Sequence, residues 1–113
     1  MTAFSGELGF TYSEAAPYLS ELGHPHRLEI FSYLVRAGEK GAPVGEIQSH
    51  LGIPKSTFSH HLRQLTSVGL VTQSREGRVI RCRVDESRVK LVKRFVNECC
   101  DGMAPLGGRP KRR

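Results

Sequence analysis

Residues 51–65 read Leu-Gly-Ile-Pro-Lys-Ser-Thr-Phe-Ser-His-His-Leu-Arg-Gln-Leu. Gly52 is of the type that ends helices, because glycine adopts the left-handed backbone conformation without strain. Pro54 is of the type that begins them, since its fixed φ suits the first turn and its missing N–H would be unpaired there anyway. Together the two residues predict a tight corner between two helices.

The helix after this corner is predicted to run from about Lys55 to Val68. Phe58, Leu62 and Leu65 recur in it at helical spacing and form an inward apolar stripe. Its other sides carry short polar and basic residues, so part of its surface is available to solvent or to a partner.

Three more helices are predicted before the corner. Thr11 and Glu14 have the spacing of a capping box, which marks the start of the first helix. Pro17 favours a slightly later start, at Ser13, because proline is best tolerated in a first turn. The predicted ranges are about 12–22 or 13–22, 25–37 and 44–51, with a loop over residues 38–42.

Beyond Gly69 the apolar residues follow a period close to two instead of 3.6. Residues 70–74 and 79–84 are predicted as two strands, joined by a hairpin turn over residues 75–78 that contains a glycine. Asp85 or Ser87 then caps a last helix, which ends between residues 99 and 102.

The composition is that of one small globular domain with a basic surplus. The chain has 113 residues, with 17 Lys and Arg against 11 Asp and Glu, which gives a net charge of +6. Such a surplus favours polyanions as partners, with nucleic acid first and an anionic membrane surface second. No apolar run approaches the ~18 residues of a membrane span, so no transmembrane helix is expected.

Three helices with a tight corner, then a basic hairpin and a final helix, are typical of a winged helix-turn-helix. Three segments also resemble the ArsR/SmtB family of bacterial repressors: residues 24–31 (His-Pro-His-Arg-Leu-Glu-Ile-Phe), 59–65 (Ser-His-His-Leu-Arg-Gln-Leu) and 68–71 (Val-Gly-Leu-Val). The similarity covers roughly residues 20 to 85. It implies a cytoplasmic bacterial repressor that binds a near-palindromic double-stranded operator as a homodimer.

We therefore expect an α+β fold, mainly α, with a two-stranded β-wing and a C-terminal dimerisation helix. The expected division is a flexible N-terminus (1–10), a winged helix-turn-helix domain for DNA binding and dimerisation (11–103) and a disordered basic tail (104–113). In helix-turn-helix dimers the half-sites lie one helical turn, ~10 bp, apart.

The helix after the corner carries the residues expected to contact DNA. A major groove admits one helix, and short polar side chains near its N-terminal end read the bases. Arginines at the wing tip can reach the backbone or the minor groove. The alternative is a solvated polar surface, against which the corner, the wing and the charge all argue. The predicted contacts are Lys55, Ser56, Thr57, Ser59, His60, Arg63, Arg75 and Arg78; His61, beside the apolar stripe, is interpreted as a core residue.

Three cysteines are too few for a disulfide scaffold and indicate a reducing compartment. Cys82 shares a strand face with Ile80 and Val84, so it is predicted to point inward, where a small buried hydrophobe is one interpretation. Cys99 and Cys100 are predicted to be accessible at the end of the last helix. About 13 helical residues, ~20 Å, separate Cys82 from them. An antiparallel pairing of last helices in a dimer would bring the pair toward Cys82 of the partner subunit.

Thiolates without a nearby cluster of His or carboxylates suit a thiophilic ion. The resemblance implies trivalent arsenic (arsenite or an organoarsenical) or antimonite as an effector at Cys82, Cys99 and Cys100, with no cofactor required. The family's best-known arsenic motif, Cys-Val-Cys before the corner, is absent, since residues 43–45 are Pro-Val-Gly. Its zinc pattern on the last helix is absent too. A thiol redox or persulfide sensor of the same fold is the alternative, because neighbouring cysteines oxidise reversibly.

Two other classes of protein, a thiol enzyme and a protein-interaction module, differ from a DNA-binding regulator in features that can be tested. No common enzyme motif occurs in the sequence. A small thiol enzyme such as an arsenate reductase needs an oxyanion loop and a low-pKa cysteine, and neither is visible, so no enzyme is expected. A winged helix that serves only protein interaction is distinguished by the lack of a salt-dependent affinity for duplex DNA.

Overall fold

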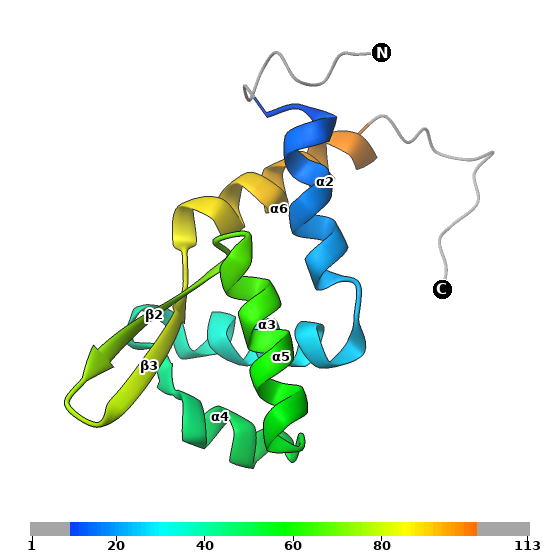
Figure 1. Cartoon of the computed structure of the whole chain (residues 1–113). Coiled ribbons are helices and arrows are strands. Elements are labelled where there is room, and N and C mark those ends of the chain that lie inside the picture. The colour runs from blue at the N-terminus through cyan, green and yellow to red at the C-terminus, as the bar shows by residue number, and fades with distance from the viewer. Residues whose placement is uncertain (1–9, 102–113) are drawn as a thin grey trace, which may run out of the picture.

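The computed structural model describes residues 10–101, which form a set of packed helices with a small antiparallel sheet projecting from it (Figure 1). The fold is mainly helical and carries a β-wing, which confirms the expected fold class. The segments 1–9 and 102–113, including the predicted basic tail, lie outside the described residues. In chain order the elements are α2 (Tyr12–Leu22), α3 (Pro25–Ala37), the 3-10 turn η1 (Gly38–Lys40), β1 (Ala42–Pro43), α4 (Val44–Leu51), α5 (Lys55–Ser67), β2 (Val71–Glu76), β3 (Val79–Val84) and α6 (Glu86–Cys100).

Helix α2 begins at the predicted capping box. The backbone N–H of Glu14 donates to Oγ1 of Thr11 at 3.1 Å, and the N–H of Thr11 donates to Oε1 of Glu14 at 2.8 Å. The helix starts at Tyr12 rather than at Ser13 and keeps Pro17 inside it. The reciprocal cap therefore sets the start of the helix, and it outweighs the backbone hydrogen bond lost at the proline.

The corner between α4 and α5 has the predicted form. Gly52 has a φ of 67°, in the left-handed region, and its N–H donates to the carbonyl oxygen of Gln48 at 2.9 Å. The side-chain amide of Gln48 donates to the carbonyl oxygen of Ile53, whose side chain is buried. Pro54 is the N-cap residue of α5. The corner is thus held by backbone conformation, one amide and one buried side chain.

The sheet has three strands in the order β1-β3-β2, one more than predicted. Ala42 of β1 lies opposite Cys82 of β3, and Val71 of β2 lies opposite Val84. The sequence predicted only a loop over residues 38–42, because a strand of two residues has no periodicity of its own and forms only when β3 is present beside it.

The hairpin is tighter than predicted. Glu76 still lies opposite Val79, which leaves only Gly77 and Arg78 in the turn. Arg75, which the sequence placed in the turn, therefore lies within β2 and follows the alternation of that strand.

Buried side chains form two clusters. The main cluster lies between α3, α4, α5 and the sheet, and includes Ile30, Leu34, Ile47 and Leu65. The second joins α2 to α6 through Phe10, Ala15 and Phe95.

Phe10 is part of the packed structure, although the sequence assigned it to the flexible N-terminal segment. Its ring centroid lies 5.9 Å from those of both Tyr18 and Phe95, and it meets Phe95 edge-on. Aromatic pairs at this spacing contribute about 0.5–1.5 kcal/mol beyond their burial.

The approach of β1 to β3 requires a glycine at position 41. Gly41 is buried with a φ of 67°, and a Cβ there would overlap the carbonyl oxygen of Cys82. We expect Gly41→Ala to lower the free energy of unfolding by about 2 kcal/mol or more. Gly45→Ala in α4, where a Cβ meets open space, should raise it by about 0.5–1 kcal/mol. Urea unfolding followed by circular dichroism measures both; equal stability of Gly41→Ala and the wild type would contradict this packing.

Candidate nucleic-acid interface

Helix α5 is anchored by its apolar side. Phe58, Leu62 and Leu65 are only 3%, 5% and 0% exposed, and the imidazole of His61 beside them is also buried, as predicted. Rotation of the helix about its axis would expose these side chains to water. The direction in which its polar side faces is therefore fixed.

The opposite side of α5 carries most of the residues predicted to contact DNA. Within residues 10–101 neither Lys55 nor Arg63 forms an ion pair, so both charges are available to a ligand. Of the six residues of α5 predicted to contact DNA, Thr57 is half-buried and the other five are exposed: Lys55, Ser56, Ser59, His60 and Arg63.

The N-terminus of α5 is also open to a ligand. No side chain caps it, and its first helical backbone hydrogen bond is donated by the N–H of Phe58 to the carbonyl oxygen of Pro54, at 2.8 Å. The backbone N–H groups of Lys55, Ser56 and Thr57, in the first turn of the helix, are therefore left for an outside acceptor. Such a helix end suits a phosphate, because both the free donors and the helix dipole favour an anion.

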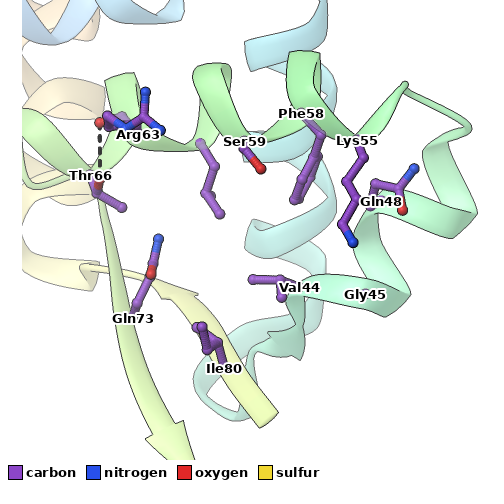
Figure 2. A pocket seen from close by; sticks show the side chains of 11 residues that line it. Val44, Gly45, Gln48, Lys55, Phe58, Ser59, Arg63, Thr66, Gln73 and Ile80 are labelled. Carbon is purple, nitrogen blue, oxygen red and sulfur yellow. Dashed lines mark hydrogen bonds between the residues drawn. The ribbon is translucent and has the colours of Figure 1, made fainter. Parts of the chain in front are cut away.

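The two predicted wing residues, Arg75 and Arg78, are exposed and form no ion pair within the described part of the chain. Arg75 lies opposite Ile80 in the ladder, so the two side chains share one face of the hairpin. Ile80 points toward α5 (Figure 2). The side chain of Arg75 therefore lies on the same face of the wing as Ile80, the face nearer to α5.

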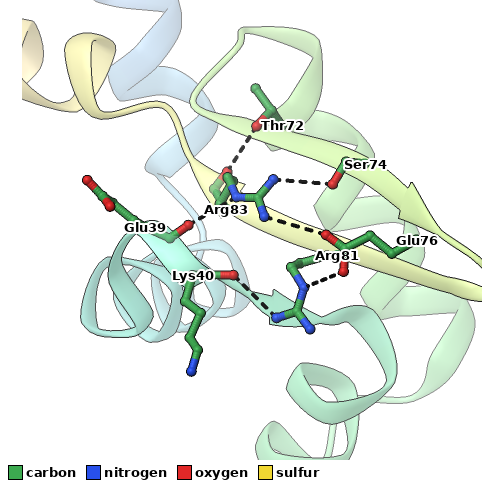
Figure 3. A network of polar contacts seen from close by, with 7 residues as sticks. All are labelled: Glu39, Lys40, Thr72, Ser74, Glu76, Arg81 and Arg83. Atoms are coloured by element: carbon green, nitrogen blue, oxygen red, sulfur yellow. Dashed lines mark hydrogen bonds and ion pairs between the residues drawn. The ribbon is translucent and has the colours of Figure 1, made fainter.

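The other arginines of the hairpin are engaged within the protein (Figure 3). Arg81 donates to Oε1 of Glu76 at 2.9 Å and to the carbonyl oxygen of Lys40 at 3.3 Å. Arg83 donates to the carbonyl oxygen of Glu39 at 3.1 Å and lies 3.8 Å from the second oxygen of Glu76. This network fastens the hairpin to η1 and uses the charges of both arginines, so it leaves Arg75 and Arg78 as the free cations of the wing.

A pocket of about 450 Å³ opens between α5, α4 and the hairpin (Figure 2). Its lining mixes apolar side chains with polar and basic ones. The apolar residues are Val44, Phe58, Leu62 and Ile80, and the polar ones include Lys55, Ser59, Arg63 and Gln73. Gln73 was not predicted as a site residue, although strand alternation from Arg75 would have placed it on the same face.

Four histidines gather where the start of α3 meets α5. The ring centroid of His61 lies 4.2 Å from that of His24, 5.6 Å from that of His26 and 5.3 Å from that of His60. His24 is the N-cap of α3, and its Nδ1 accepts the N–H of His26 at 3.1 Å. Burial first, and then the neighbouring basic groups, lower the pKa of His61, which favours its neutral form.

The three cysteines lie in two different environments. Cys82 is fully buried on β3, as its strand face predicted, and burial raises the pKa of its thiol to about 11. Cys99 and Cys100 are exposed in the last turn of α6. The 15 residues of α6 span ~22 Å and carry the pair away from β3 (Figure 1). Within residues 10–101 no group of three or more His, Cys, Asp or Glu is arranged to hold a metal ion, so the cysteine site stays a prediction.

The sequence matches a known domain family and resembles a transcriptional regulator. The family described as "Helix-turn-helix domain" matches residues 22–74, from the end of α2 into β2. An uncharacterized HTH-type transcriptional regulator of Methanocaldococcus jannaschii is 33% identical over 87 residues, covering 77% of this chain and 96% of that protein. The chain belongs to the helix-turn-helix transcriptional regulators. These proteins act by binding DNA, which confirms that this chain is a regulator and not an enzyme.

Solved structures share the whole architecture of this regulator. An ArsR-family transcriptional regulator superposes with a TM-score of 0.67 at 22% identity, covering 89% of this chain and 99% of that one. The transcriptional repressor BigR from Xylella fastidiosa is 30% identical, with a TM-score of 0.60 and coverage of 81% and 88%. The homodimeric winged helix-turn-helix DNA-binding domain of a possible ArsR-family regulator from Mycobacterium bovis is 24% identical, with a TM-score of 0.62 and coverage of 89% of each chain. The fold is thus the ArsR-type winged helix.

None of the helices within residues 10–101 is both long enough and apolar enough to span a membrane.

The low pKa of His61 has a consequence for stability. The unfolded chain binds this proton near the ordinary value of 6.5, and the folded chain binds it only at lower pH. The free energy of unfolding should therefore fall as pH decreases below about 6.5, until the folded pKa is passed. His61→Gln should weaken this dependence, whereas His50→Gln, at an exposed histidine of α4, should retain it. Urea unfolding at a series of pH values measures the slope; an unchanged slope in His61→Gln would be the contrary result.

Proposed function

We propose that this regulator represses transcription by holding operator DNA as a homodimer, with α5 in the major groove and the wing against the phosphate backbone or minor groove. The observation that carries the proposal is the exposed polar side of α5, which begins at an N-terminus that no side chain caps and bears Lys55 and Arg63, two cations without an ion pair within residues 10–101. The major groove of DNA accepts one α-helix, with the exposed side of the helix turned toward the base edges. Repression is supported by the likeness to a transcriptional repressor at 30% identity.

The proposed contacts divide by chemistry. Arginine pairs with guanine through two hydrogen bonds, and hydroxyl or imidazole groups reach other base edges, so the middle of the exposed side reads sequence. The helix end and the wing hold phosphates, which fix position without reading bases. The base-reading set is Ser59, His60 and Arg63, and the phosphate-binding set is Lys55, Ser56, Thr57, Arg75 and Arg78.

Homodimer formation is supported by apolar side chains left exposed on α2 and α6. Tyr12 and Leu19 of α2 are 51% and 39% exposed, and Val96 of α6 is 41% exposed. Tyr12 and Leu19 are seven residues apart and so share one side of α2. A neighbour of the same fold is homodimeric. A two-fold dimer would present its two α5 helices to half-sites one turn, ~10 bp, apart.

We further propose that trivalent arsenic or antimony releases the operator by binding cysteine thiolates. Cys99 and Cys100 support this, because they are exposed and adjacent, and soft thiolates favour such ions. A site shared between the last helices of two protomers would favour a dimer whose α5 helices no longer match the groove spacing. Cys82, the third candidate ligand, is fully buried, so its participation requires the partner helix to open β3.

A thiol redox or persulfide response is the alternative for the same residues. The exposed pair is open to oxidants as well as to metalloids, and it lies at a helix end that a dimer partner can approach. The two responses differ in their trigger, since an oxidant such as hydrogen peroxide oxidises thiols, whereas a trivalent metalloid binds thiolates without oxidising them.

The DNA contacts are tested by the salt dependence of binding. Arg75→Ala and Arg78→Ala should each reduce by about one the slope of log affinity against log salt, because each removes one phosphate contact. Arg63→Ala should also relax base preference, at a cost of about 1–3 kcal/mol for the correct base. Fluorescence anisotropy on a duplex selected from a random pool measures both quantities.

Lys90→Ala, at an exposed cation of α6, is the matched control and should keep the wild-type slope. No binding to any duplex at low ionic strength would contradict DNA binding altogether. Wild-type slopes in both wing variants would contradict only the role of the wing.

The effector is tested on the protein–operator complex with arsenite, phenylarsenite, antimonite and hydrogen peroxide. Release by a metalloid should be lost when Cys99→Ser and Cys100→Ser are combined, with DNA affinity unchanged. Cys82→Ala decides whether the third sulfur takes part. Release by peroxide alone, reversed by dithiothreitol, would assign the redox alternative. Unchanged affinity with every reagent would refute a thiol sensor.

A further inference from the structure

The pocket between α5, α4 and the hairpin has apolar lining residues that a phosphate backbone does not need. They are Val44, Phe58, Leu62 and Ile80, of which Figure 2 labels Val44, Phe58 and Ile80. Apolar surface of this kind stabilises a ligand that removes it from water, at about 25 cal/mol for each Å². Its volume of about 450 Å³ lies in the range of ~300–1,000 Å³ found for small-molecule sites.

The charge around the pocket is positive and unopposed. Figure 2 shows Lys55 at one end of the pocket and Arg63 at the other. No Asp or Glu lines it. Glu46, next to the pocket residue Gly45, instead accepts a hydrogen bond from the hydroxyl of Tyr33 at 2.6 Å. Glu76 is held by arginines on the outer face of the sheet. An anionic group is therefore the complement of this site.

We propose that the pocket binds a small amphipathic carboxylate, with a ring or branched hydrocarbon against the apolar lining residues and the carboxylate on the guanidinium of Arg63. Ser59 and Gln73 supply further donors, since neither side chain makes a hydrogen bond within the described residues. Charge-assisted hydrogen bonds from arginine to a carboxylate give the head group its selectivity.

Occupancy of the pocket has a consequence for DNA, and this part rests on the proposed function. Lys55, Ser59 and Arg63 line the pocket and are also proposed DNA contacts. A carboxylate that engages Arg63 takes a charge that a phosphate or a base would use. Carboxylate and duplex are therefore mutually exclusive, and this route to release is independent of the cysteines.

Binding is tested on the free full-length protein with 2-naphthoate as the probe. Titration followed by ¹H–¹⁵N correlation spectra should shift the amide of Gly45 and the side-chain amide of Gln73. Acetate, which has the charge without the ring, and 2-naphthamide, which has the ring without the charge, should bind at least about tenfold more weakly. Equal binding of naphthoate and naphthamide, or shifts confined to another region, would overturn the proposal.

Two variants separate the apolar from the charged part of the site. A side chain at position 45 starts in open space at the pocket rim. Gly45→Leu should therefore obstruct the pocket and weaken naphthoate binding about tenfold or more, while Gly45→Ala, the matched control, stays within about threefold. Arg63→Gln, at an exposed position, should reduce naphthoate binding to the level of naphthamide and leave naphthamide unchanged. Wild-type naphthoate affinity in Gly45→Leu or Arg63→Gln would refute the site.

Competition is measured last, by anisotropy on a labelled duplex. Naphthoate at ten times its dissociation constant should raise the apparent Kd of the duplex about elevenfold, as mutual exclusion requires. Naphthoate binding without any effect on the duplex would overturn the exclusion and leave DNA binding intact. Duplex binding with no naphthoate binding would show that DNA alone occupies this face.

Discussion

The burial of one side of α5 is the constraint on which the rest of the structure depends. Phe58, Leu62 and Leu65 together contribute roughly 4–9 kcal/mol of hydrophobic stabilisation before the opposing conformational entropy is counted. A domain of this size has a net stability of only ~5–15 kcal/mol. The helix therefore cannot turn its polar side elsewhere and remain folded. The core, rather than any local interaction of the polar residues, decides which side chains reach a ligand.

The carboxylate of Glu76 decides which arginines of the wing are neutralised and which stay available, a difference that the sequence alone does not show. Glu76 lies on the same face of the hairpin as Arg81 and engages both Arg81 and Arg83. Arg75 lies on the opposite face and Arg78 in the turn, so neither is neutralised. Exposed ion pairs contribute little to stability, commonly below ~1 kcal/mol. The importance of this network is therefore in its geometry, which fixes the hairpin on η1.

Local signals in the sequence located most elements, and long-range contacts account for what it missed. The corner was visible because Gly52 and Pro54 act through their own backbone preferences, and the inward direction of Cys82 followed from strand alternation. Strand β1 was not predicted, because its two residues form a strand only by pairing with β3, about 40 positions away. The contact of His24 with His61 was not predicted for the same reason, since it joins residues far apart in the sequence.

In the candidate site, too, local patterns predicted some features and long-range packing determines the others. The exposed residues of α5 could be named from helical spacing, because the apolar stripe fixes the remaining directions. The pocket could not, since its walls come from α4, α5 and both strands of the hairpin. The half-buried state of Thr57 also depends on packing that no local pattern encodes.

Tyr18 connects the two parts of the interior. Its ring packs against both clusters of buried side chains, and its hydroxyl accepts a hydrogen bond from Nε of Arg88 at 3.1 Å. Phe95, one turn before the exposed cysteines, belongs to the second cluster only. Val92, one turn earlier in α6, belongs to the main cluster, so α6 contacts both parts of the interior and Tyr18 is a second route between them. Buried side chains thus run without interruption from the cysteine-bearing helix to the core that holds α5.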